Sequence, residues 1–119
     1  MFYSVSVDRS NGLVMAILEG FWTADIAATY WAELFRAAET IAVGGARVRY
    51  LIDARRLGVQ SQSVVDFNSR AAADAQFTDA KVAFVVEGAL LGRQASRIRP
   101  GVNHRAFKGI EEARRWLIE

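Results

Sequence analysis

The sequence predicts an α/β fold in which an N-terminal β-hairpin precedes alternating helices and strands, giving a mixed, mainly parallel sheet flanked by helices. Three observations support this fold class. Asn11-Gly12 is a turn signal between two apolar runs. Apolar residues then recur at helical spacing after Thr23, and a nearly uninterrupted apolar run follows Lys81. Helices that alternate with strands in this way are typical of sheets built through right-handed crossovers.

Five strands are expected from short runs that are rich in β-branched and aromatic residues and are bounded by turn residues. They are expected at residues 2–8, 13–18, 47–53, 81–86 and 104–107. The fourth is apolar on both of its faces, which is typical of a strand covered on both sides.

Four helices are expected around these strands. Thr23 is a favoured N-cap for the first helix, which ends near Val43, just before two glycines. Ser61 or Ser63 caps a second helix that ends near Phe77, after a loop over 54–60. The third and fourth helices are expected at 89–97 and 110–118.

The composition fits a single domain that spans residues 1–119. Hydrophobic residues make up 52% of the chain and charged residues 24%, as in globular proteins.

The lack of cysteine excludes disulfides, thiolate catalysis and thiolate metal sites, and it is consistent with the cytoplasm, where we expect the protein. We expect neither a signal peptide nor a transmembrane segment. A net charge of +2 is too near balance to indicate a general nucleic-acid binder.

Four phrases of the sequence occur in a distinctive order. They are Leu18-Glu19-Gly20-Phe21-Trp22-Thr23, Val48-Arg49-Tyr50-Leu51-Ile52-Asp53, Val82-Ala83-Phe84-Val85-Val86, and Ala106-Phe107 followed by Glu112-Ala113-Arg114-Arg115-Trp116-Leu117. In this order and spacing the chain resembles the SpoIIAA-like branch of the STAS-domain superfamily over nearly its whole length. The resemblance implies a bacterial protein-interaction module without catalysis, and some relatives are thought to hold small or lipid-like ligands.

In the phosphoswitch members of that superfamily, a serine at the start of the second helix follows an aspartate directly and is phosphorylated. The matching region here is 58–63, which makes Ser61 and Ser63 the phosphoacceptor candidates. The aspartate and the following glycine are missing, and this departs from the pattern of anti-sigma-factor antagonists. The alternative is that both serines only cap the helix.

Polar residues follow the third expected strand, at the sheet edge where α/β folds place ligands. Asp53 either contacts a ligand or caps the turn after it. Arg55 and Arg56 precede the second helix and suit an anion, or else they belong to a solvated loop. An enzyme would need two carboxylates with separated pKa values, and only Asp53 and Glu87 are candidates near this edge.

A basic stretch occupies the C-terminal third of the chain, with no acidic residue between Gly88 and Lys108. Arg93 and Arg97 share a helix face, and Leu90 could add an apolar lining. An acidic protein, a lipid headgroup or a phosphorylated ligand would explain these arginines, and so would a solvated face. Electrostatic association with a membrane or nucleic acid is a further alternative.

The aromatic residues leave two interpretations open. Trp22, Tyr30 and Ile26 lie off the expected buried stripe and form either an exposed patch for a homodimer or ligand, or a packing contact with the hairpin. His104 is expected to be structural, and neither a metal site nor a cofactor is expected. The sequence therefore predicts a non-catalytic binding or regulatory module whose ligand is a protein or an apolar or anionic, lipid-like small molecule.

Overall fold

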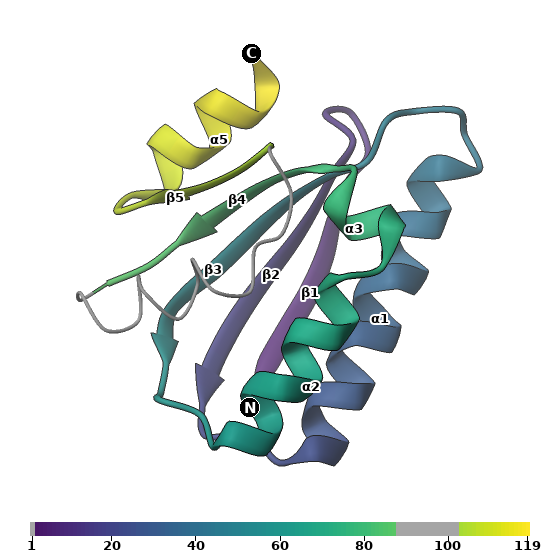
Figure 1. Ribbon diagram of the computed structural model, residues 1–119. Helices are drawn as coiled ribbons and strands as arrows, with labels where there is room; N and C mark the ends of the chain where they lie inside the picture. Colours follow the sequence, from purple (N-terminus) through teal and green to yellow (C-terminus); the bar gives the residue numbers. More distant parts are fainter. Residues whose placement is uncertain (1, 88–102) are drawn as a thin grey trace.

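The computed structural model describes residues 2–87 and 103–119, which form a five-stranded sheet with helices on both faces (Figure 1). Its strands are β1 (Tyr3–Asp8), β2 (Leu13–Gly20), β3 (Arg49–Leu57), β4 (Lys81–Val85) and β5 (His104–Phe107). They lie side by side in chain order. β1 is antiparallel to β2, and every later neighbouring pair is parallel. The expected hairpin and the mainly parallel sheet are confirmed.

Helices cover the two faces of the sheet unequally (Figure 1). One face carries α1 (Ala24–Ala42), α2 (Gln62–Ala72) and α3 (Ala75–Thr78), and the other carries α5 (Ile110–Ile118). Each face has its own apolar core, and β4 contributes to both. Val82 and Phe84 point to the larger core, whereas Ala83 and Val85 point to the core under α5, as its continuous apolar run predicted.

The hairpin turn depends on glycine. Four residues, Arg9 to Gly12, connect the two strands, and Gly12 adopts a positive φ of 65°. A Cβ at Gly12 would lie 2.8 Å from the carbonyl oxygen of Arg47, so both the dihedral angle and the space require glycine. The turn expected at this point is confirmed.

β2 and β3 run further than the sequence indicated, because they pair with each other beyond their expected ends. β2 ends at Gly20 instead of Leu18, and β3 covers Arg49–Leu57 instead of 47–53. Gly20 lies opposite Leu57, after an irregularity in the register. More than half of the loop that was expected after β3 is therefore strand.

The long second helix expected from the sequence is two helices. Asp74 has an extended backbone (φ −60°, ψ 135°), and its carboxylate accepts a hydrogen bond from the backbone N–H of Gln76 to cap α3. Aspartate competes with helical hydrogen bonds in this way, so the helix breaks before it reaches Phe77. Ser61, rather than Ser63, is the N-cap of α2. The helix expected at 89–97 lies outside the described residues.

The aromatic residues near the hairpin are buried rather than exposed. Trp22 is 6% and Tyr30 is 3% exposed. Their rings lie 6.0 and 5.5 Å from the ring of Tyr3 on β1. Packing against the hairpin is therefore the correct interpretation, and an exposed patch that includes Trp22 and Tyr30 is wrong.

Asp8 ties the hairpin turn to α5. Its carboxylate accepts hydrogen bonds from Ser10 Oγ at 2.7 Å, from Asn11 Nδ2 at 3.0 Å and from Arg114 of α5 at 2.7 Å. The hydrogen bonds from Asn11 and Ser10, aided by the charge of Arg114, lower the pKa of Asp8 to about 2. The folded chain therefore stabilises the ionised form of this carboxyl relative to the protonated form.

We expect Asp8→Asn to remove a pH-dependent part of the stability. A carboxyl whose pKa is lower in the folded chain stabilises the fold above its unfolded pKa of about 3.9, and this contribution disappears as the pH falls through about 2. Urea unfolding should show wild type more stable than the variant at pH 6 and nearly equal to it at pH 2. The exposed Asp79→Asn is the control, and a gap between wild type and Asp8→Asn that is independent of pH would contradict this account.

Candidate ligand-binding pocket

A pocket of about 60 Å³ lies in the larger core, between the sheet and the helices on that face. Its walls come from β2, β3, β4, α1, α2, α3 and the two connections that enter α1 and α2. The residues that line it are Leu18, Trp22, Tyr30, Trp31, Ile52, Ala54, Leu57, Gln60, Val65, Asn68, Ala72, Phe77 and Phe84. None of these described lining residues carries a charge at neutral pH.

One wall is a continuous series of aromatic rings. Trp22 lies 5.0 Å from Tyr30, Tyr30 lies 5.4 Å from Trp31, and Trp31 lies 5.2 Å from Phe77, measured between ring centroids. All three pairs are edge to face, which is a favoured geometry for aromatic rings. The rings therefore hold one another in place and present a rigid apolar surface to a guest.

Gln60 fixes the end of the pocket where the chain enters α1 and α2. Its Oε1 accepts the backbone N–H of Trp22 at 2.7 Å, and its Nε2 donates to the carbonyl oxygens of Gly20 and Gly58, also at 2.7 Å. The residue is 9% exposed. One side chain thus joins the end of β2 to the end of β3, and its own polar atoms are occupied.

Asn68 is the second amide of the pocket. Its Oδ1 accepts the indole N–H of Trp31 at 2.9 Å, which orients both side chains. It lies on the buried stripe of α2, between Val64 and Ala72. Within the described part of the chain, no hydrogen bond uses its amide nitrogen, so this group can donate to a guest.

The tyrosines of this core stay neutral. Burial raises the pKa of Tyr30, which lines the pocket, and also the pKa of Tyr50 on β3. A buried tyrosinate would find no cationic partner among the described residues that line the pocket, which is costly. The described lining therefore offers neutral polar groups rather than a charge.

The size and lining of the pocket restrict what it can hold. A cavity of about 150 Å³ with apolar walls holds benzene, so 60 Å³ accommodates a smaller apolar group. The described lining also gives an anionic group no cationic partner, and burying an unpaired carboxylate is unfavourable. The geometry suits the apolar end of a neutral molecule.

Asp53 and Arg55 lie away from this pocket. Arg55 donates to both carboxylate oxygens of Asp53, at 3.0 and 2.9 Å, and its backbone N–H donates to the same carboxylate at 3.2 Å. Partial burial raises the pKa of Asp53, but the bonds and charge of Arg55 outweigh it and hold that pKa below its ordinary value. Asp53 lies within β3 rather than at its end, and it is satisfied by its own neighbour.

The other predicted site residues are dispersed. Arg56 lies 3.6 Å from Glu19, and its side chain is 77% exposed. Glu87 is exposed beyond the end of β4 and, like Asp53, does not line the pocket, so these two carboxylates do not converge there. Three further candidates, Leu90, Arg93 and Arg97, lie outside the described residues. No group of three metal-binding side chains occurs within 2–87 and 103–119.

Comparison with known proteins identifies the architecture. No family model matches the chain, and no curated protein does. A solved structure from Shewanella loihica PV-4, an uncharacterised protein of the DUF3478 family with a SpoIIAA-like fold, superposes with a TM-score of 0.67. The match covers 98% of this chain and 93% of that one, at 20% sequence identity. The fold is SpoIIAA-like. At this identity the likeness shows the fold alone.

The SpoIIAA-like fold places both serine candidates at the start of α2. Ser61 Oγ accepts the backbone N–H of Val64 at 3.4 Å and lies 3.2 Å from Ser63 Oγ, and both residues are exposed. Neither serine lines the pocket, although Gln60 before them and Val65 after them do. Among the described helices, none is long and apolar enough to cross a membrane.

Sequence reasoning missed most of the residues that build the pocket; it named Trp22 and Tyr30 for a ligand or a homodimer, but on an exposed patch. Most of them are apolar and cannot be told from an ordinary core by their type. Asn68 gave the one usable signal, because an amide that replaces an apolar residue in a helical stripe must find a buried partner. Gln60 gave none, since its three partners come together only when β2 and β3 have paired.

Proposed function

We propose that this chain is a non-catalytic binding module of a bacterial cytoplasm that holds the apolar end of a small neutral molecule in the aromatic pocket. The observation that supports the proposal is the lining itself, which combines a rigid aromatic wall with the amide of Asn68. Ligand sites are commonly concave and apolar, with a few polar groups that orient the guest. The SpoIIAA-like fold is consistent with a binding or regulatory module.

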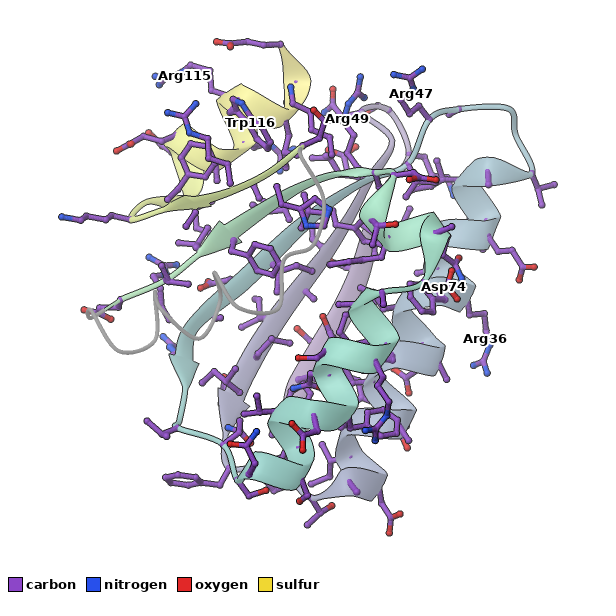
Figure 2. The ribbon with its side chains drawn as sticks, in the orientation of Figure 1. Arg36, Arg47, Arg49, Asp74, Arg115 and Trp116 are labelled. Atoms are coloured by element: carbon purple, nitrogen blue, oxygen red, sulfur yellow. The ribbon has the colours of Figure 1, made fainter. Side chains whose placement is uncertain are left out.

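Tryptophan fluorescence can test the pocket directly. Two of the three tryptophans, Trp22 and Trp31, line it, whereas Trp116 lies on α5 at the other face of the sheet (Figure 2). In a Trp116→Phe background, titration with 1-propanol, which is smaller than benzene, should change the emission and saturate. Propanoate, of equal chain length, should bind at least about tenfold more weakly, because the described lining leaves its charge unpaired.

A matched pair of substitutions gives the control. Ala54→Val adds volume inside the pocket and should weaken propanol binding about tenfold. Ala46→Val makes the same change on an exposed loop and should leave binding unaltered. A titration that never saturates, or an Ala54→Val variant that binds like wild type, would refute the pocket proposal. Tighter binding of propanoate than of propanol would instead assign an anionic ligand.

A protein-interaction role switched by phosphorylation is the second candidate. It is supported by the exposure of Ser61 and Ser63 at the start of α2, where the positive end of the helix dipole favours a phosphate. Intact-mass measurement of the protein from its own cells separates the two candidates. A phosphate on either serine favours the switch, whereas a small molecule that is released on denaturation favours the pocket.

A further inference from the structure

β1 leaves one row of backbone groups without partners. The backbone N–H of Glu19 donates to the carbonyl of Phe2 at 2.8 Å, so Phe2 and Glu19 are a hydrogen-bonded pair of the antiparallel ladder. Hydrogen-bonded and non-hydrogen-bonded pairs alternate along such a ladder. Ser4 and Ser6 therefore exchange hydrogen bonds with β2, while the N–H and C=O groups of Tyr3, Val5 and Val7 point away from it. β1 is the end strand of the sheet and pairs only with β2 among the described residues.

This edge lacks most of the features that usually prevent strand pairing. β1 has six residues, its register with β2 is uninterrupted, and it contains no lysine, arginine or proline. Its one charged residue, Asp8, is the last of the strand. Edge strands in monomeric proteins are commonly short, charged, bulged or interrupted by proline. The strand at the other end of the sheet, β5, fits that rule, since it has four residues and includes an exposed arginine, Arg105.

The core is also incomplete along β1. Tyr3, Val5 and Val7 point into the larger core but remain partly exposed, whereas their neighbours on β2 are almost fully buried. Ile26 and Ala37 of α1 are likewise only partly buried against this core. The side chains of Tyr3, Val5 and Val7 thus form a largely apolar strip along the open edge, where the Tyr3 hydroxyl meets the carboxylate of Glu33 on α1. Arg36 projects from α1 away from the sheet (Figure 2).

We propose that β1 pairs with β1 of a second copy, antiparallel and centred on Val5, to form one continuous sheet. In this register Val5 faces Val5 of the partner, Tyr3 faces Val7, and Ser4 faces Ser6. Apolar side chains meet apolar ones and serines meet serines, and Asp8 faces Phe2 rather than a second carboxylate. The three facing pairs with outward backbone groups would form about six hydrogen bonds, two for each pair.

The choice of a second copy follows from this self-complementarity. The strip and the outward backbone groups belong to the same three residues, so a single pairing satisfies both. Among residues 2–8 no like charges lie opposite one another, and in an isologous interface every contact made by one copy is repeated by the other. This interface is independent of the ligand pocket and differs from the patch around Trp22 and Tyr30 that the sequence indicated.

Charge substitutions at Ser4 and Ser6 test the register without altering the core, because both side chains are exposed on the face away from α1. In Ser4→Lys/Ser6→Lys each lysine faces a lysine of the partner, and in Ser4→Glu/Ser6→Glu each glutamate faces a glutamate. Sedimentation velocity should show wild type as a dimer. In each variant alone, the dissociation constant should rise about tenfold or more.

Two arrangements that place opposite charges face to face serve as controls. Equal amounts of the Lys/Lys and Glu/Glu variants should form heterodimers. The single-chain variant Ser4→Glu/Ser6→Lys places opposite charges face to face and should remain a dimer. Circular dichroism shows that each variant is folded. A wild type that stays monomeric up to millimolar concentration would overturn the proposal, and so would a dimer that the Lys/Lys variant leaves intact.

Amide hydrogen exchange gives an independent readout at the strand itself. In the wild-type dimer, the amides of Tyr3, Val5 and Val7 should be protected, and in the Lys/Lys variant they should exchange rapidly. The amides of Ser4 and Ser6 donate to β2 and should stay protected in both. Equal exchange of the three outward amides in the two proteins would place the dimer contact elsewhere and reject the β1 interface.

Discussion

We expect Phe77→Ala to lower the free energy of unfolding by about 3–5 kcal/mol, the usual cost of truncating a buried phenylalanine. Phe77 is 1% exposed and lies where α3 meets the sheet. Its ring lies 5.2 Å from Trp31, 5.0 Å from Tyr50 and 5.3 Å from His104, measured between ring centroids. Few side chains could collapse into the space it leaves, because rigid rings surround it. Urea unfolding followed by circular dichroism measures the loss.

Two variants define the control for this experiment. Phe21→Ala removes the same ring from a residue that is 71% exposed, and it should change stability by less than about 1 kcal/mol. Phe77→Leu keeps most of the buried volume and should cost clearly less than Phe77→Ala. If Phe77→Ala and Phe21→Ala had equal effects, Phe77 would not be the centre of the aromatic cluster.

The fold could be predicted largely because its signals are local. β5 (His104–Phe107) and α5 (Ile110–Ile118) have the bounds that the sequence indicated. A glycine turn, a threonine N-cap and a helical apolar stripe each specify a neighbouring element without knowledge of the rest. The hairpin and α1 (Ala24–Ala42) were predictable for the same reason.

The errors occurred where distant parts of the chain decide the local structure. β3 continues through Arg55 and Arg56 because β2 lies beside it, although two consecutive arginines do not by themselves indicate a strand. Asp74 ends the second helix because its carboxylate caps the next one. Neither outcome can be read from periodicity, since each depends on a hydrogen bond that competes with the local preference.

The candidate site shows a related limit. Chemical reasoning from the sequence selects charged and hydroxyl residues, and it selected Asp53, Arg55 and Ser61. The structure satisfies Asp53 with Arg55 and uses Ser61 as a helix cap. The pocket is built instead from apolar residues and two amides, whose types alone resemble an ordinary core. A pocket of this kind becomes visible only when the helices are packed on the sheet.

We expect Gln60→Ala to lower the free energy of unfolding by about 2–4 kcal/mol, because it leaves the N–H of Trp22 and the carbonyl of Gly58 without their partner. The carbonyl of Gly20 also loses a hydrogen bond, although it still accepts the backbone N–H of Gly58 at 3.0 Å. Exposed Gln62→Ala, two residues along, should cost less than about 1 kcal/mol. Urea unfolding of the two variants in parallel measures the difference.

Gln60→Glu separates the loss of hydrogen bonds from the loss of volume, since it keeps the size of the side chain. A carboxylate still accepts the N–H of Trp22, but it cannot donate to the carbonyls of Gly20 and Gly58, and its charge repels them. We therefore expect it to be at least as damaging as Gln60→Ala at pH 7. Protonation restores one donor, so the Glu variant should regain stability relative to wild type as the pH falls below its raised pKa. If Gln60→Glu and wild type had the same free energy of unfolding at pH 7, the two hydrogen bonds donated by Gln60 would contribute nothing to stability. Packing alone would then hold β2 against β3 at this end of the pocket.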